Sequence, residues 1–484
     1  MAEKYILAID QSTSGTKAFL FDSLGTILCR RDRGHEQKIS ANGWVAHDPL
    51  EIYRNTIGVV GELLEKAGID KGKIIGAGIS NQRETALVWD RKSGLPVYDA
   101  VVWQCTRGLE ICNRLVAHGE ETRAATGLPL SPYFSAAKIA WILEHTQNQS
   151  NQNLCAGTID SWLVYKLTGN FKTDYSNASR TQLLNLSSPQ WDERVCGFFG
   201  ISPSLLPEIC DSNSCFGHTD FEGLLPHPVP IHCAMGDSHA ALFGQGCLQK
   251  GMGKATYGTG SSVMINVGEK PIFCKNVVSS LAWGIDGKVN HVVEGNIHYT
   301  GAVIKWLVED VGLLSSSKEA GKLAASANPQ DTTVLVPAFS GLGAPYWATD
   351  AKACFCGMTR NTGRAELVKA AEECIAFQIT DVLKAIQEEA AITLSELRVD
   401  GGASNDSFLM QFQSDMLNLP LSVPANEELS GTGVAYLAGI ALGIYTYENL
   451  AKIPRTYYRP LMQSGTREYH YKKWKDAVKR TILV

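Results

Sequence analysis

Short apolar runs, separated by turns rich in glycine, serine and threonine, recur along the chain and predict alternating strands and helices. Residues 5–9 form one such run, residues 10–17 form a turn, and residues 18–21 form a second run. This order predicts a strand, a tight turn and a returning strand. Further runs at residues 74–79 and 86–90 predict two more strands in the same half of the chain.

The second half of the chain repeats this arrangement. Residues 256–267 contain a Gly-Thr-Gly turn inside a β-type run, which predicts a second hairpin. A helix is predicted around residues 302–308, and a predicted strand at residues 397–400 leads into Gly401 and Gly402. At 484 residues the chain is too long for one ordinary core, so we expect one α/β half used twice.

The two glycine-containing turns carry the first functional signal. Such turns can bring backbone N–H groups and hydroxyls close to a polyanion, because glycine lets the backbone approach. One turn in each half favours a phosphate chain held between two related domains. Either turn alone is better explained as an ordinary hairpin.

Composition and charge narrow the choice of partners and compartment. A net charge of −5 without a long basic run argues against nucleic acid and anionic membranes as partners. The uncharged stretch at residues 431–447 is shorter than the roughly 20 residues a membrane helix needs, so it predicts a buried helix. Residues 1–4 lead directly into a strand, which argues against a signal peptide. The 13 cysteines include no C-x-x-C pair, which favours reduced cytoplasmic thiols over a zinc site.

Common nucleotide motifs are missing, which leaves carboxylates beside turns as candidates. No G-x-G-x-x-G sequence occurs, and the glycine spacing of a P-loop at residues 246–251 is followed by Met252 where lysine is required. Asp10 opens the first turn, where it could hold hydrated Mg²⁺ or simply cap the turn. Asp237 follows a strand-like run and Gly236, where it could accept a proton from a substrate hydroxyl or cap a helix.

Two further places could contact a polar substrate. Arg83 and Glu84 are adjacent at the end of a predicted strand, where they could hydrogen-bond neighbouring hydroxyls. As a surface pair they would contribute little. Trp103 could form an apolar wall for a carbon backbone, although most single tryptophans belong to the core.

Taken together, these segments resemble the FGGY carbohydrate-kinase family, and most closely its glycerol kinases. The resemblance covers nearly the whole chain in order, and residues 133–142 fit the family signature without a gap. The other matching segments are residues 10–22, 43–49, 80–85, 102–105, 173–181, 236–237, 257–260, 341–347 and 399–403.

The resemblance implies two actin-like (ribonuclease H-like) ATPase domains, residues 1–246 and 247–484, with a catalytic cleft between them. It implies ATP and Mg²⁺ as cofactors and transfer of the γ-phosphoryl group to a terminal hydroxyl of glycerol or a related small polyol. It also implies a homodimer or homotetramer. By the same resemblance, Asp237 is the general base and Asp10 the carboxylate on the metal side. The residues implied to contact ATP are Thr13, Ser14, Lys17, Thr259, Gly301, Lys305, Gly402 and Asp406. The residues implied to contact the polyol are Arg83, Glu84, Trp103, Tyr133, Asp237, Ser238 and Ser262.

Departures from the glycerol-kinase pattern leave the substrate open. Ser238 stands where those enzymes usually have Gln, and Ser262 where they usually have Phe, so the substrate site should be longer and more polar. A four- or five-carbon polyol or ketose is therefore an alternative to glycerol. Lys305 and Asp406 stand in place of Gln and Asn and are expected to alter nucleotide contacts. An actin-like nucleotide-binding regulatory protein, or an ATPase without a small-molecule acceptor, stays a further alternative.

Overall fold

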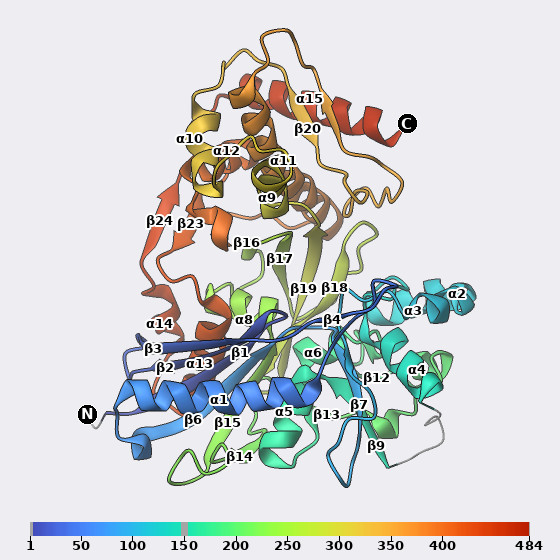
Figure 1. Ribbon diagram of the computed structural model, residues 1–484, viewed down its shortest axis with the longest axis vertical. Coiled ribbons are helices and arrows are strands. Elements are labelled where there is room, and N and C mark those ends of the chain that lie inside the picture. The colour runs from blue at the N-terminus through green and yellow to red at the C-terminus, as the bar shows by residue number, and fades with distance from the viewer. Residues whose placement is uncertain (1–2, 147–152, 484) are drawn as a thin grey trace.

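The chain forms two α/β halves that lie one above the other along the long axis of the molecule (Figure 1). A computed structural model describes residues 3–146 and 153–483. Residues 1 and 2, part of the segment that argues against a signal peptide, lie outside this range. Among the described residues, no helix combines the length and apolar composition needed to cross a bilayer.

The main sheet of the first half has the strand order β14-β15-β6-β1-β2-β3. β1 pairs in parallel with β6 and antiparallel with β2, and all of its residues are buried. Its side chains alternate between two helical layers: Leu7 packs in the cluster that contains α1 and α5, and Ile6 in the cluster that contains α8 and α13. The strand bounds are β1 Tyr5–Gln11, β2 Gly15–Phe21, β3 Ile27–Gly34, β6 Ile74–Asn81, β14 Gly217–Thr219 and β15 Val229–Gly236.

A smaller sheet of the first half has the order β4-β5-β8-β7-β9. Helix α4 packs on it, burying Ile139 and Ile142 against β7 and β9. The remaining strands of this half are β4 Lys38–Ile39, β5 Val45–His47, β7 Ala86–Asp90, β8 Ala100–Val101, β9 Leu154–Thr158, β10 Lys172–Asp174, β11 Leu184–Asn185, β12 Gln190–Trp191 and β13 Glu208–Cys210. Its helices are α1 Pro49–Ala67, α2 Leu109–Arg114, α3 Gly119–Thr126, α4 Ser135–His145, α5 Ile159–Thr168, α6 Tyr175–Ser179, α7 Glu193–Phe198, α8 Asp237–Gly244, η1 Lys71–Lys73, η2 Val116–His118 and η3 Pro203–Leu205.

The second half is built on the sheet β18-β19-β17-β16-β22-β23-β24. The long helix α11 supplies much of its core, where Phe377 stacks on Trp474 of α15 at 5.3 Å between ring centres. The strands are β16 Gly253–Tyr257, β17 Ser261–Gly268, β18 Val278–Ile285, β19 Lys288–Ile297, β20 Val334–Val336, β21 Cys354–Cys356, β22 Leu397–Asp400, β23 Leu421–Pro424 and β24 Arg455–Tyr458. The helices are α9 Gly301–Glu309, α10 Ala320–Ala325, α11 Arg364–Ala390, α12 Ser407–Leu417, α13 Leu429–Ala441, α14 Tyr447–Ala451, α15 Ser464–Ile482, η4 Ser317–Glu319 and η5 Gly402–Asn405.

Helix α13 connects the two halves, because it belongs to the second half of the sequence and packs on the main sheet of the first. It lies against β6, β1, β15 and α8, and Val434 and Leu437 share a cluster with Ile6 and Met235. The helix predicted at residues 431–447 is therefore present and buried, but it ends at Ala441. The boundary between residues 246 and 247 stays a prediction.

The sequence-based strands and hairpins agree closely with the structure. The predicted strands at residues 86–90 and 397–400 have the bounds of β7 and β22, and both glycine-containing turns join antiparallel strands. Cys354 and Cys356 flank Phe355 on β21.

Candidate active site

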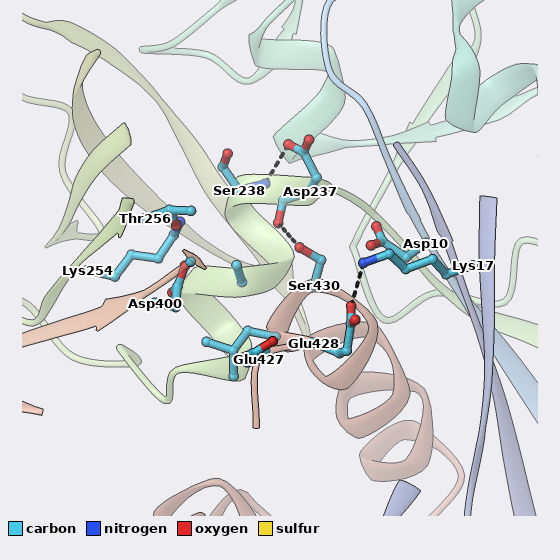
Figure 2. A pocket seen from close by; sticks show the side chains of 13 residues that line it. Asp10, Lys17, Asp237, Ser238, Lys254, Thr256, Asp400, Glu427, Glu428 and Ser430 are labelled. Atoms are coloured by element: carbon cyan, nitrogen blue, oxygen red, sulfur yellow. Dashed lines mark hydrogen bonds and ion pairs between the residues drawn. The ribbon is translucent and has the colours of Figure 1, made fainter. Parts of the chain in front are cut away.

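A pocket of about 210 Å³ lies between the two halves and is lined from both sides (Figure 2). The first half contributes Asp10, Lys17, Asp237 and Ser238 together with Ala241, and the second half contributes Lys254, Thr256, Asp400, Gly401, Glu427, Glu428, Leu429 and Ser430.

Strand order explains why Asp10 and Asp237 share this pocket. β1 and β15 both pair in parallel with β6, so all three strands end at the same edge of the sheet. Asp10 is the second-last residue of β1, and Asp237 follows β15 as the first residue of α8. Ligands commonly bind at the carboxyl ends of parallel strands in α/β folds. The helix cap is Gly236 rather than Asp237, so the capping alternative for Asp237 does not describe its position.

Asp10 is a buried carboxylate with an unused oxygen. Burial raises the pKa of Asp10 to about 6, with Lys17 opposing this shift and the neighbouring Asp237 contributing to it. Among the described residues, Oδ1 of Asp10 has no hydrogen-bond partner although it is shielded from solvent. An unpartnered carboxylate oxygen beside a second carboxylate suits a hydrated divalent cation such as Mg²⁺.

Lys17, an expected phosphate contact, is engaged by the second half of the chain. Its ammonium lies 2.8 Å from Oε2 of Glu428, just before α13, and Arg30 contacts the other oxygen of the same carboxylate. The pocket-facing end of the first hairpin is thus tied to the loop that enters α13.

Arg83 is the centre of a buried ion network. Its two terminal nitrogens each donate to one oxygen of Glu294 at 2.9 Å, and its Nε lies 3.2 Å from Oδ1 of Asp237. Arg83 comes from the first half, and Glu294 from β19 of the second. A bidentate pair of this kind fixes both position and orientation of the guanidinium. The network therefore holds the predicted base against the second half.

Glu84 is paired with Arg180 rather than with its neighbour Arg83. Its backbone has a positive φ of 60°, a conformation that costs a non-glycine residue energy and is concentrated at functional sites. Its carboxylate accepts from Nε of Arg180 at 2.6 Å, and Arg180 also lies 3.2 Å from Glu294. Arg83 and Glu84 are both buried and have separate partners, so they are not a surface ion pair.

The sequence analysis did not single out Glu294 or Arg180. A signal for Glu294 was available, because it is a charged residue within the apolar run that became β19. Charged residues in buried strands are rare unless they are paired. Arg180 lies in a segment used only for the family resemblance, and nothing local distinguishes it from a surface arginine.

Trp103 and Tyr133, both predicted to contact the polyol, pack against each other. Their ring centres are 5.7 Å apart in an edge-to-face arrangement. Nε1 of Trp103 donates to Oγ1 of Thr13 at 2.9 Å, so a predicted polyol residue directly contacts a predicted phosphate residue. Ser14, the neighbour of Thr13, is exposed at the tip of the first hairpin.

The two unexpected serines differ in their contacts. Ser238 lines the pocket, and its backbone N–H donates to Oδ1 of Asp237 at 2.6 Å. Ser262 donates its hydroxyl to Oε1 of Glu294 at 2.9 Å, so it joins the ion network around Arg83. Neither residue fills the space of a Gln or Phe side chain.

Four of the eight predicted nucleotide residues, Thr259, Gly301, Gly402 and Asp406, lie around the second hairpin and the helices beside it. The carbonyl of Thr259 accepts from two amides at the start of α9, and a Cβ on Gly301 would lie 2.8 Å from the carbonyl oxygen of Gly258. Gly402 faces open space beside the pocket residue Gly401, and Asp406 caps α12.

Lys305 is not brought into this cluster by any contact. Its side chain is 67 % exposed and lies 3.6 Å from Glu309 one turn along α9. Its ATP role stays a prediction.

Comparison with known proteins identifies the family. The model of the FGGY carbohydrate-kinase N-terminal domain matches residues 5–244, and that of the C-terminal domain matches residues 253–442. The chain belongs to the FGGY family of carbohydrate kinases. It is 46 % identical to glycerol kinase 1 of Thermotoga maritima over 99 % of both chains. It is 44 % identical to glycerol kinase of Carboxydothermus hydrogenoformans, over 99 % of this chain and 98 % of that one.

A solved structure shows the same architecture. The glycerol kinase of Plasmodium falciparum with ADP superposes with a TM-score of 0.93 at 34 % identity, covering 99 % of this chain and 98 % of that one. The predicted fold class, two α/β domains of the FGGY kinase type, is confirmed. The chain is accordingly a phosphotransferase with an alcohol group as acceptor, and the regulatory and acceptor-free ATPase alternatives are set aside.

Removing Glu294 should destabilise the protein strongly. Glu294→Ala leaves Arg83 and Arg180 buried without their shared carboxylate, a loss that typically costs about 3 to 5 kcal/mol. Thermal unfolding should show a midpoint lowered by several degrees. Glu309→Ala, which breaks an exposed pair on α9, is the matched control and should cost less than about 0.5 kcal/mol. Equal midpoints for the two variants would contradict a structural role for the network.

Asp10→Asn should stabilise the ligand-free protein at high pH while abolishing activity. The folded-state pKa of about 6 exceeds the ordinary value of 3.8, so the folded state binds this proton more tightly than the unfolded state. Ionisation of Asp10 therefore costs stability as the pH rises from 4 to 6, on the order of 3 kcal/mol in full. The variant should unfold at higher temperature than the wild type at pH 8, with the difference shrinking towards pH 4.

The exposed Asp32→Asn on β3 is the control, because its side chain is 65 % exposed and no such difference is expected. A lower midpoint for Asp10→Asn at pH 8 would contradict the burial argument, and retained turnover would contradict the predicted metal role of Asp10.

Proposed function

We propose that this protein is an ATP-dependent glycerol kinase that transfers the γ-phosphoryl group to a terminal hydroxyl in the pocket between its two halves. The observation that carries the proposal is the meeting of Asp10, Asp237 and Arg83 at one sheet edge, opposite the second hairpin. Full-length similarity to glycerol kinases supports the same acceptor.

Asp237 takes the role of general base in this proposal. Its carboxylate is oriented by two donors, Nε of Arg83 at 3.2 Å and the N–H of Ser238 at 2.6 Å, and its side chain remains 35 % exposed towards the pocket. It can accept the proton of an acceptor hydroxyl as the oxygen attacks phosphorus. Phosphoryl transfer otherwise depends mainly on positioning and charge neutralisation.

Mg²⁺ and ATP complete the proposed site. Asp10 would hold Mg²⁺, which when bound neutralises phosphate charge in a pocket rich in carboxylates. Thr13, Ser14, Lys17 and Thr259 would contact the phosphates, and Gly301, Gly402 and Asp406 would border the nucleotide. Arg83, Glu84, Trp103 and Tyr133 would bind the polyol, with the two rings against its carbon chain.

A longer polyol or ketose remains the second candidate substrate. Ser238 leaves room beside the base, and Ser262 adds a hydroxyl next to Glu294, where a larger side chain would close the site. The proposal also includes two domains, residues 1–246 and 247–484. It further includes assembly as a homodimer or homotetramer and a cytoplasmic location.

Replacing the base tests the chemistry directly. Asp237→Asn keeps the shape of the side chain and removes the proton acceptor, so kcat should fall by about 10²-fold or more. ADP affinity, measured by calorimetry, should change by less than about threefold. Near-normal turnover would show that Asp237 is not the base.

Enlarging Ser262 tests the size of the acceptor site. Ser262→Phe should raise the ratio of kcat/KM for glycerol over xylitol by roughly tenfold, because the ring excludes extra carbons. Ser262→Ala is the control for loss of the hydrogen bond to Glu294 without added volume. An unchanged ratio in the phenylalanine variant would refute the volume argument.

A further inference from the structure

Lys254 is a buried lysine in the pocket whose charge the proposed mechanism has not used. It lies on β16, and its side chain is 1 % exposed. Because side chains alternate along a strand, Lys254 and Thr256 face the pocket while Ala255 and Tyr257 belong to the core of the second half. Parallel pairing places Asp400 of β22 beside Thr256 on the same wall (Figure 2).

The ammonium of Lys254 has little to balance its charge. Its hydrogen-bond partner is the hydroxyl of Thr256, and among the described residues no carboxylate oxygen lies within 4.0 Å of it. Asp400, on the same wall, instead accepts from the amide of Gln245 at 2.8 Å. A buried ammonium without a counter-ion is costly, so its retention calls for an anion that arrives with the substrate.

The other lysine of the pocket is already neutralised. Lys17 is held at 2.8 Å by Glu428, whereas the lining as a whole contains the carboxylates of Asp10, Asp237, Asp400, Glu427 and Glu428. Lys254 is thus the lining cation that lacks an ion pair within the described part of the chain. It faces the wall that carries Asp237, and the predicted polyol residues Glu84, Trp103 and Tyr133 do not line this pocket. Its position therefore favours a phosphoryl group over a polyol hydroxyl.

We propose that Lys254 is a catalytic residue that binds the transferring γ-phosphoryl group and neutralises its charge in the transition state. This inference rests on the phosphoryl transfer proposed above. In that step the acceptor oxygen forms a bond to the γ-phosphorus, the bond from this phosphorus to the β–γ bridging oxygen breaks, and ADP leaves with the bond electrons. The hydroxyl proton passes to Asp237. Lys254 neither forms nor breaks a covalent bond. Its ammonium stabilises the negative charge on the oxygens of the γ-phosphoryl group while that group is transferred.

The test compares Lys254→Gln with Lys254→Arg. Glutamine keeps a donor for Thr256 and removes the charge, and arginine keeps the charge. Turnover is measured with the acceptor that gives the wild type its highest kcat/KM, so the identity of the acceptor does not decide the result. We expect kcat of the glutamine variant to fall by about 10²-fold and that of the arginine variant to stay within about tenfold of wild type.

Two binding measurements separate catalysis from structure. Affinity for Mg-ADP should change by less than about threefold in Lys254→Gln, whereas inhibition by aluminium fluoride with ADP and acceptor, which mimics the transferring group, should weaken by about 10²-fold. Lys288→Gln, at the exposed start of β19, is the matched control and should leave all three quantities unchanged.

Turnover of Lys254→Gln within about threefold of wild type would overturn the inference, as would slow turnover with full fluoride inhibition. If Lys254→Gln does not fold, Lys254→Met, which also removes the charge, is measured in its place. Loss of fluoride inhibition with ADP affinity kept supports the inference, and both quantities unchanged overturn it. Acceptor-independent ADP release by the wild type would instead contradict the proposed function itself.

Discussion

The bidentate pair between Arg83 and Glu294 is the interaction on which the site depends. It joins the end of β6 in the first half to β19 in the second, and it leaves Nε of Arg83 free to contact Asp237. Both side chains are buried, so neither charge can be removed without leaving the other uncompensated. The pair couples the position of Asp237, the proposed base, to the contact between the halves.

Around this pair, the fold supplies the two walls of the pocket by separate means. Parallel strands of the first half end at one edge and bring Asp10 and Asp237 together. The second hairpin and β22 present Lys254, Thr256 and Asp400 from the opposite side. Helix α13 ties the second half of the sequence to the first half, because it packs on the first-half sheet and the loop before it binds Lys17 through Glu428.

Local pattern was enough to predict much of the fold and the two carboxylates. The strands that became β1, β6, β7 and β22 are apolar runs with clear turns after them, and Asp10 and Asp237 stand beside such turns. Local pattern could not reveal Arg180, Glu428 or Lys254 as members of the site, and for Glu294 it offered only the signal of a charge within an apolar run. Their importance comes from partners far away in sequence, or from the lack of one, and both are properties of the folded chain. The packing of α13 on the first half could not be predicted from the sequence for the same reason, because a buried apolar helix has the same sequence pattern wherever it packs.

The function proposed for the pocket is transfer of the γ-phosphoryl group from ATP to glycerol. The most direct measurement is ADP release by the wild type with Mg-ATP, alone and with glycerol, erythritol, threitol, erythrulose, xylitol, ribitol, xylulose or ribulose. We expect ADP release that requires an acceptor, with the highest kcat/KM for glycerol and glycerol 3-phosphate as the product. ADP release at the same rate without acceptor, or a clearly higher kcat/KM for one of the longer compounds, would contradict it.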